Sequence, residues 1–103
     1  MRCDKFTDLE RRNSELEARC LAKDEAYCSD WFFDVVYHIH ALRRRHEQSY
    51  RKPYLSAISE KDWLMIEQET KETPIEIGTK LLLEGWQAKL LHELRDLEAL
   101  VWH

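Results

Sequence analysis

The side chains in this 103-residue sequence that could do chemistry are its histidines, carboxylates and cysteines. His38 and His40 are separated by one residue, as in a metal-binding pair. Both rings would point the same way on a β-strand, but on a helix they diverge by about 200°. Because we expect a helix here, the pair predicts no metal site, and we expect no metal ligand and no cofactor.

His92 and Asp96 lie four residues apart on one face of a predicted helix, with Glu93 next to His92. This resembles half of a helical His-Glu metal motif, but the second histidine is absent. We expect a solvated polar face instead. Carboxylate pairs elsewhere have no base, nucleophile or phosphate loop beside them, and the two isolated glycines form no phosphate cradle. We therefore assign no catalytic residue and expect a protein that is not an enzyme.

One basic cluster interrupts the acidic chain, and it consists of Arg43, Arg44, Arg45, Arg51 and Lys52. Two tyrosines lie within and beside it, and arginine with aromatic rings suits phosphate contacts and base stacking. Three successive arginines, however, point in different directions around a helix. They also suit salt bridges within the chain, the negative end of a helix dipole, or an acidic protein partner.

Large aromatic side chains occupy an unexpected face of the predicted helix at 31–50. Phe33, Tyr37, His40 and Arg44 share this face, opposite the apolar face that includes Val35, Ile39 and Leu42. Aromatic residues and arginine contribute much of the energy of protein interfaces. We interpret the four residues as a partner-binding surface, and the alternative is that another helix of the same chain covers them.

Capping signals and apolar periodicity predict the remaining helices. The first begins at Thr7 with a narrow apolar stripe, and a short one follows Ser59. Thr73, Pro74 and Glu76 predict the start of a last helix that extends to Trp102, with a possible bend near Gly85. The fold class is therefore all-α, a small bundle of three to five helices with a long C-terminal helix, in one domain spanning 1–103.

The apolar face of the last helix spreads over roughly 200° of arc, more than one neighbouring helix covers. We assign this face to self-association in a homodimer, because large apolar patches mark interfaces. Its residues are Leu83, Trp86, Leu90, Leu94, Leu97 and Val101.

Composition excludes several classes of protein. Two glycines and two prolines exclude collagen-like and low-complexity chains, and eleven aromatic residues argue against disorder. A net charge of -4 excludes a wholly basic nucleic-acid binder. Three cysteines without framework spacing, a charged N-terminus and the lack of a long apolar run predict a cytosolic protein with reduced thiols and no membrane segment.

Together these patterns predict a small protein–protein interaction module, acting as an adaptor, inhibitor or regulatory subunit. It would occupy the surface of another protein, whose identity the sequence does not reveal, and would form a homodimer. The alternative is a nucleic-acid-associated regulator that uses the basic segment 43–52.

Overall fold

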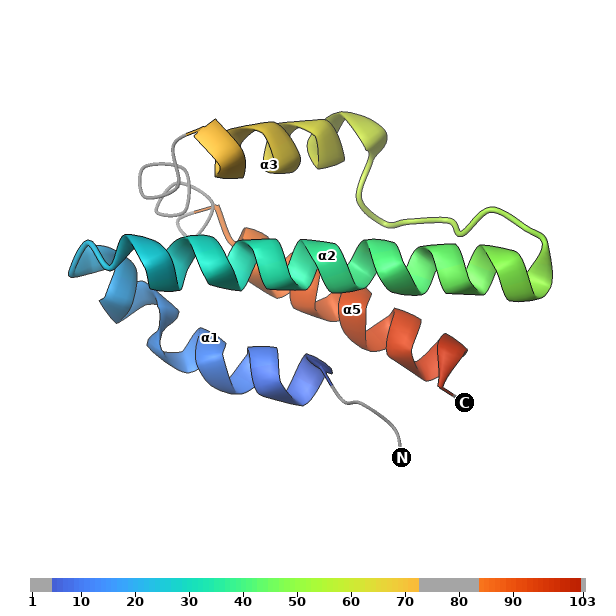
Figure 1. Cartoon of the computed structure of the whole chain (residues 1–103), viewed down its shortest axis with the longest axis horizontal. Coiled ribbons are helices and arrows are strands. Elements are labelled where there is room, and N and C mark those ends of the chain that lie inside the picture. Colours follow the sequence, from blue (N-terminus) through green and yellow to red (C-terminus); the bar gives the residue numbers. More distant parts are fainter. Residues whose placement is uncertain (1–4, 73–83, 103) are drawn as a thin grey trace.

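The computed structural model describes residues 5–72 and 84–102, and these ranges contain four helices and no strand. The helices are α1 (Lys5–Leu21), α2 (Glu25–Tyr50), α3 (Glu60–Glu72) and α5 (Trp86–Val101). α2 spans the length of the molecule, with α3 along one side and α1 along the other, while α5 crosses behind α2 (Figure 1). The prediction of an all-α bundle is confirmed.

The α1–α2 hairpin turns at Lys23, which adopts a left-handed conformation with φ 59°. The Asp24 N–H donates to the Arg19 carbonyl, and the Lys23 N–H donates to the Cys20 carbonyl. These two bonds form a Schellman motif that ends α1. Asp24 then caps α2, since its side chain accepts from the Tyr27 N–H at 3.2 Å. α2 therefore begins at Glu25, six residues before the predicted start.

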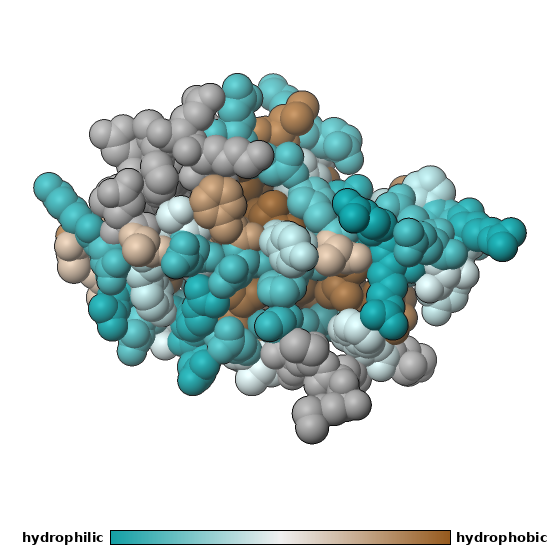
Figure 2. All heavy atoms as spheres, in the orientation of Figure 1, coloured by the Kyte–Doolittle hydropathy of each residue, from teal (hydrophilic) through white to brown (hydrophobic). Residues whose placement is uncertain are grey.

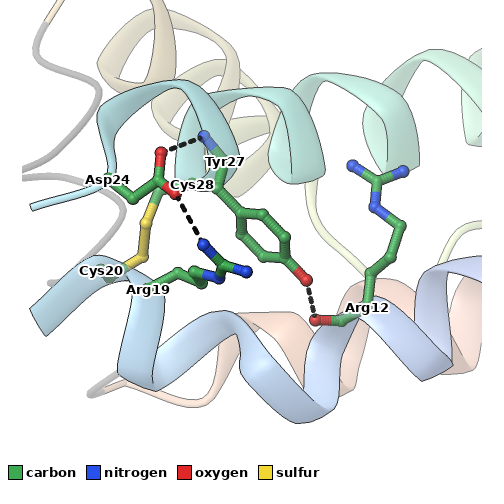
Figure 3. Close-up of a disulfide and its surroundings, with 6 residues drawn as sticks. All are labelled: Arg12, Arg19, Cys20, Asp24, Tyr27 and Cys28. Carbon is green, nitrogen blue, oxygen red and sulfur yellow. Dashed lines mark hydrogen bonds and ion pairs between the residues drawn. A yellow bond between two sulfur atoms is a disulfide. The ribbon is translucent and has the colours of Figure 1, made fainter. Parts of the chain in front are cut away.

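A disulfide between Cys20 and Cys28 joins the two helices beside this turn (Figure 3). Both cysteines are buried. This bond corrects the expectation of three reduced thiols, because the turn brings together two cysteines that are eight residues apart. Cys3 lies outside the described residues.

Two aromatic side chains of α2 bind the backbone of α1 further along the hairpin. The Tyr27 hydroxyl donates to the Arg12 carbonyl at 2.7 Å, and the Trp31 indole N–H donates to the Leu9 carbonyl at 2.9 Å. The Arg12 guanidinium also pairs with Asp34 at 2.8 Å. Burial of Trp31 therefore leaves no unpaired indole N–H, and α1 is fixed in register against α2.

The N-terminus of α1 depends on a residue from the other end of the chain. The backbone N–H groups of Lys5 and Phe6 donate to Oε1 of Glu98, at 2.9 and 3.1 Å. A carboxylate at this position satisfies free N–H groups and complements the helix dipole. α1 consequently starts two residues before Thr7, the predicted cap.

Local signals define both ends of the 51–59 connection. The Arg51 N–H donates to the Glu47 carbonyl from a left-handed conformation, which ends α2 before Pro53 as predicted. The hydroxyl of Ser59 accepts from the Asp62 N–H at 3.2 Å and caps α3 as predicted. Leu64 of α3 is exposed.

The last helix begins after a left-handed glycine. Gly85 has φ 77° and precedes α5 directly. Such a conformation interrupts a right-handed helix, so α5 starts at Trp86 and not before Gly85. The predicted start at Thr73, Pro74 and Glu76 lies outside the described residues.

The core lies where α1, α2 and α5 meet, and its buried apolar side chains come from all four helices and the 51–59 connection. They are Leu9, Leu16, Cys20, Cys28, Trp31, Phe32, Val35, Ile39, Leu42, Ile58, Trp63, Ile66, Trp86, Leu90, Leu91, Leu94 and Leu97. No helix within the described ranges has the length and apolar character that a membrane span requires.

Candidate interaction surface

The outer face of α2 carries large side chains that the rest of the chain leaves in solvent. Tyr37 is 69% exposed and Phe33 is 41% exposed. Arg44 on the same face is exposed and forms no ion pair with any residue that the structure describes. Figure 2 shows pale and brown side chains along the course of α2, bordered by hydrophilic ones. Three of the four residues assigned to partner binding are thus exposed.

His40, the fourth residue, is partly covered by α3. Its ring lies 5.2 Å from the ring of Trp63, centroid to centroid, and its Nε2 contacts Oε1 of Glu67. Another helix of the same chain therefore covers this face at His40, but not at Tyr37. The imidazole ties α3 to α2 in the middle of the candidate surface.

α3 extends the surface with an exposed apolar side chain. Glu60, Leu64 and Glu67 share one face of α3 because they lie four and three residues apart. Glu60 pairs with Arg43 at 3.7 Å, and Glu67 contacts His40, so this face borders α2. Leu64, 64% exposed, lies between the two glutamates and belongs to the same edge.

The basic cluster is divided between intramolecular contacts and solvent. Arg43 lies over the rings of Tyr54 and Trp63, each 5.9 Å from the ring centroid. Arg45 lies 4.3 Å from the centroid of Trp102. These contacts hold two arginines against the chain's own aromatic rings. Arg44, Arg51 and Lys52 are exposed, and Arg45 is exposed as well despite its contact with Trp102.

The leucine face of α5 is not a surface. Leu90, Leu94 and Leu97 have no solvent exposure, Trp86 is buried and Val101 is half-buried. The wide apolar arc is covered by α1, α2 and the 51–59 connection together, so the premise that a single chain cannot shelter it is wrong. Leu83 lies outside the described residues. Self-association therefore needs a different surface.

Glu93 is buried within α5, which corrects the expectation of a solvated polar face at this position. Its Oε1 accepts from the Tyr54 hydroxyl at 2.9 Å and from the Ala57 N–H at 3.2 Å, and its Oε2 accepts from the Ser56 hydroxyl at 2.6 Å. These three donors satisfy a carboxylate that is 2% exposed. Burial, followed by the bond to Glu93, raises the pKa of Tyr54.

The position of Glu93 in the sequence contains the signal that could have revealed its burial. It follows Leu90 by three residues and precedes Leu97 by four, which is the spacing of core positions in a helix. His92 and Asp96, in contrast, are exposed as predicted, with 3.3 Å between Nε2 and the Asp96 carboxylate. Glu93 fastens the segment 54–58 to α5.

His38 and His40 point in different directions, as expected for two residues separated by one position on a helix. His38 faces a cavity of about 190 Å³ that Lys5, Arg45 and Trp102 also line, whereas His40 faces α3. Burial and the nearby Lys5 charge lower the pKa of His38. Within residues 5–72 and 84–102, no three His, Cys, Asp or Glu side chains are arranged to hold a metal ion.

Comparisons with known proteins add no assignment to this surface. Neither the protein-family models nor the curated proteins nor the solved structures contain a match to the chain.

Proposed function

We propose that the protein is a small interaction module that acts by contact with another protein, and that the outer face of α2 is its contact surface. The observation that carries this proposal is the exposure of Tyr37 and Phe33 beside an arginine without a described ion-pair partner. Aromatic rings and arginine supply large contact areas at low cost in side-chain entropy. Leu64 adds an apolar contact at the α3 edge of the surface.

An adaptor, an inhibitor or a regulatory subunit would use such a surface in the same way. None of these roles needs a catalytic residue, and the buried carboxylate of Glu93 and the buried indole N–H of Trp31 both bond to groups of the fold. The expected homodimer stays a proposal, now without the leucine face of α5.

A double substitution tests the contact surface. Phe33→Asp with Tyr37→Asp should leave the far-UV circular dichroism unchanged, because both side chains are exposed, and should abolish capture of a protein partner from native lysate. Leu55→Asp is the matched control, because Leu55 is 90% exposed in the 51–59 connection. Equal capture by both variants would contradict the proposal, and unfolding of the double variant would show that the face belongs to the core.

Nucleic-acid binding through the basic segment is the second candidate. It is favoured by the exposure of Arg44, Arg51 and Lys52 near the end of α2, and it is weakened by the aromatic contacts that occupy Arg43 and Arg45. Titration with mixed DNA and RNA at two salt concentrations should show a steep salt dependence if this function holds. Arg44→Glu should then abolish binding, and a lack of binding at low salt would eliminate the candidate.

The disulfide of the structure stands against the cytosolic location expected from the sequence, and the redox state of Cys20 and Cys28 in cells decides between them. Cytosolic thiols are kept reduced, whereas disulfides persist in oxidising compartments. Trapping with an alkylating reagent at cell lysis, followed by mass spectrometry, should find Cys20 and Cys28 alkylated if the protein resides in the cytosol. A bonded pair would contradict that location.

A further inference from the structure

The exposed stripe of α2 is symmetric about Tyr37. Seven residues form this stripe, and all seven are exposed: Ala26, Asp30, Phe33, Tyr37, Ala41, Arg44 and Gln48. Their spacings along the helix are four, three, four, four, three and four, which read the same in both directions. At 100° per residue they fall within roughly 80° of arc, so they form one continuous strip along the helix.

We propose that a second copy of this chain occupies the stripe, with the two α2 helices antiparallel and Tyr37 at the two-fold axis. In this arrangement each position pairs with the one equally far from Tyr37 on the other side. Asp30 then meets Arg44 of the second copy, twice in each dimer, and opposite charges pair at both ends of the contact. An isologous interface needs this kind of self-complementary patch.

In the same register, large side chains of one copy face small side chains of the other. Phe33 lies four residues before Tyr37 and Ala41 four residues after it, so each large ring faces a small side chain of the other copy. Ala41 also lines the cavity of about 190 Å³ beside α2. A cavity of roughly 150 Å³ accommodates benzene, so this one has room for the ring of Phe33 from the second copy.

The charges at Asp30 and Arg44 favour a second copy over other occupants. Neither residue forms an ion pair within the described parts of the chain. A nucleic acid would be attracted by Arg44 but repelled by Asp30, whereas a second copy satisfies both. α2 runs across the broad face of a molecule that measures 42 × 31 × 18 Å (Figure 1), and all seven residues of the stripe on it are exposed.

This inference rests on the proposed function, because it names the occupant of the same surface. Sedimentation velocity over a range of protein concentrations should show a monomer–dimer equilibrium for the wild-type chain. Asp30→Arg and Arg44→Asp should each raise the dimer dissociation constant by about tenfold, since each replaces two ion pairs with two like-charge contacts. The variant carrying both substitutions should dimerise like the wild type, because the pairs re-form with reversed sign.

Mixing the two single variants gives the sharpest result. Asp30→Arg places arginine at both positions and Arg44→Asp places aspartate at both, so an equimolar mixture should form a heterodimer although each variant alone is mainly monomeric. Glu10→Arg is the matched control, because Glu10 is an exposed carboxylate on α1, and it should leave the dissociation constant unchanged.

A monomer at all concentrations, or a dimer insensitive to these charge reversals, would overturn the second-copy inference. The proposed function would then be decided separately by the Phe33 and Tyr37 double variant, whose loss of capture would assign the face to a different protein. A wild-type dimer together with no heterodimer in the mixture would also overturn the antiparallel register.

Discussion

Replacement of Glu93 by leucine should detach the segment 54–58 from α5. The carboxylate accepts hydrogen bonds from Tyr54, Ser56 and Ala57, and it is the residue through which this segment is bonded to α5 in the described structure. Leucine fills most of the same volume but accepts no hydrogen bond. The substitution therefore removes the bonds without leaving a large cavity.

The expected loss follows from the number of donors. A typical hydrogen bond contributes about 1 kcal/mol net to stability, and bonds to charged groups contribute more. Tyr54, Ser56 and Ala57 all retain access to water, so each donor can bond to water in the variant. The cost of losing each bond therefore stays near the value for a typical hydrogen bond. Three bonds therefore correspond to about 3 kcal/mol in the free energy of unfolding. A solvated glutamate, as the sequence suggested, would change it by about 0.5 kcal/mol or less.

Urea unfolding followed by circular dichroism measures this difference, and hydrogen exchange locates it. The Ala57 amide, which donates to Glu93, should lose its protection in the variant. Glu93→Gln should be milder, at about 1 kcal/mol, because the amide keeps one acceptor oxygen. A loss below about 0.5 kcal/mol for the leucine variant, with the Ala57 amide still protected, would refute the assigned role.

Three further predictions concern single features of the fold. Burial raises the pKa of Tyr54 in the folded protein. Its contribution to the free energy of unfolding should therefore be complete below pH ~10 and decline above it, because the phenol of the unfolded chain ionises first. The free energy of unfolding of Tyr54→Phe should depend less steeply on pH in the alkaline range. Reduction of the disulfide between Cys20 and Cys28 opens a short loop and should lower the free energy of unfolding by about 2.5 kcal/mol in urea titrations, whereas Cys20→Ala should not respond to the reductant. Gly85→Ala should cost about 1 kcal/mol by thermal unfolding, since φ is 77° and no atom lies within 4 Å of an added Cβ; an unchanged midpoint would show that the turn relaxes.

Local chemistry made part of the fold predictable. The end of α2 before Pro53 and the start of α3 after Ser59 depend on residues adjacent in the chain, and both agree with the sequence. Periodicity placed Phe33 and Tyr37 opposite the apolar face of α2, but it left open whether another helix covers them, and the structure shows both exposed.

Contacts between distant residues were not predictable in this way. Glu98 caps α1 from 92 and 93 residues away, and the fold brings Cys20 and Cys28 together across a turn. The solvated polar face expected at His92 and Asp96 does not extend to Glu93. A carboxylate is rarely buried without a cation, yet three neutral donors satisfy it here. The assignment of the α5 leucines to a dimer failed because it counted one neighbouring helix where two helices and a connection cover the face.

The central claim is that the outer face of α2 contacts protein, and that its occupant is a second copy. A cysteine at the two-fold axis tests it most directly: in a Cys3→Ser background, Tyr37→Cys should form a covalent dimer under mild oxidation, with residue 37 linked to residue 37 in the mass spectrum. Ala18→Cys, exposed on α1, is the control and should remain monomeric. Failure of the position 37 variant to cross-link, or equal yields at both positions, would contradict the account.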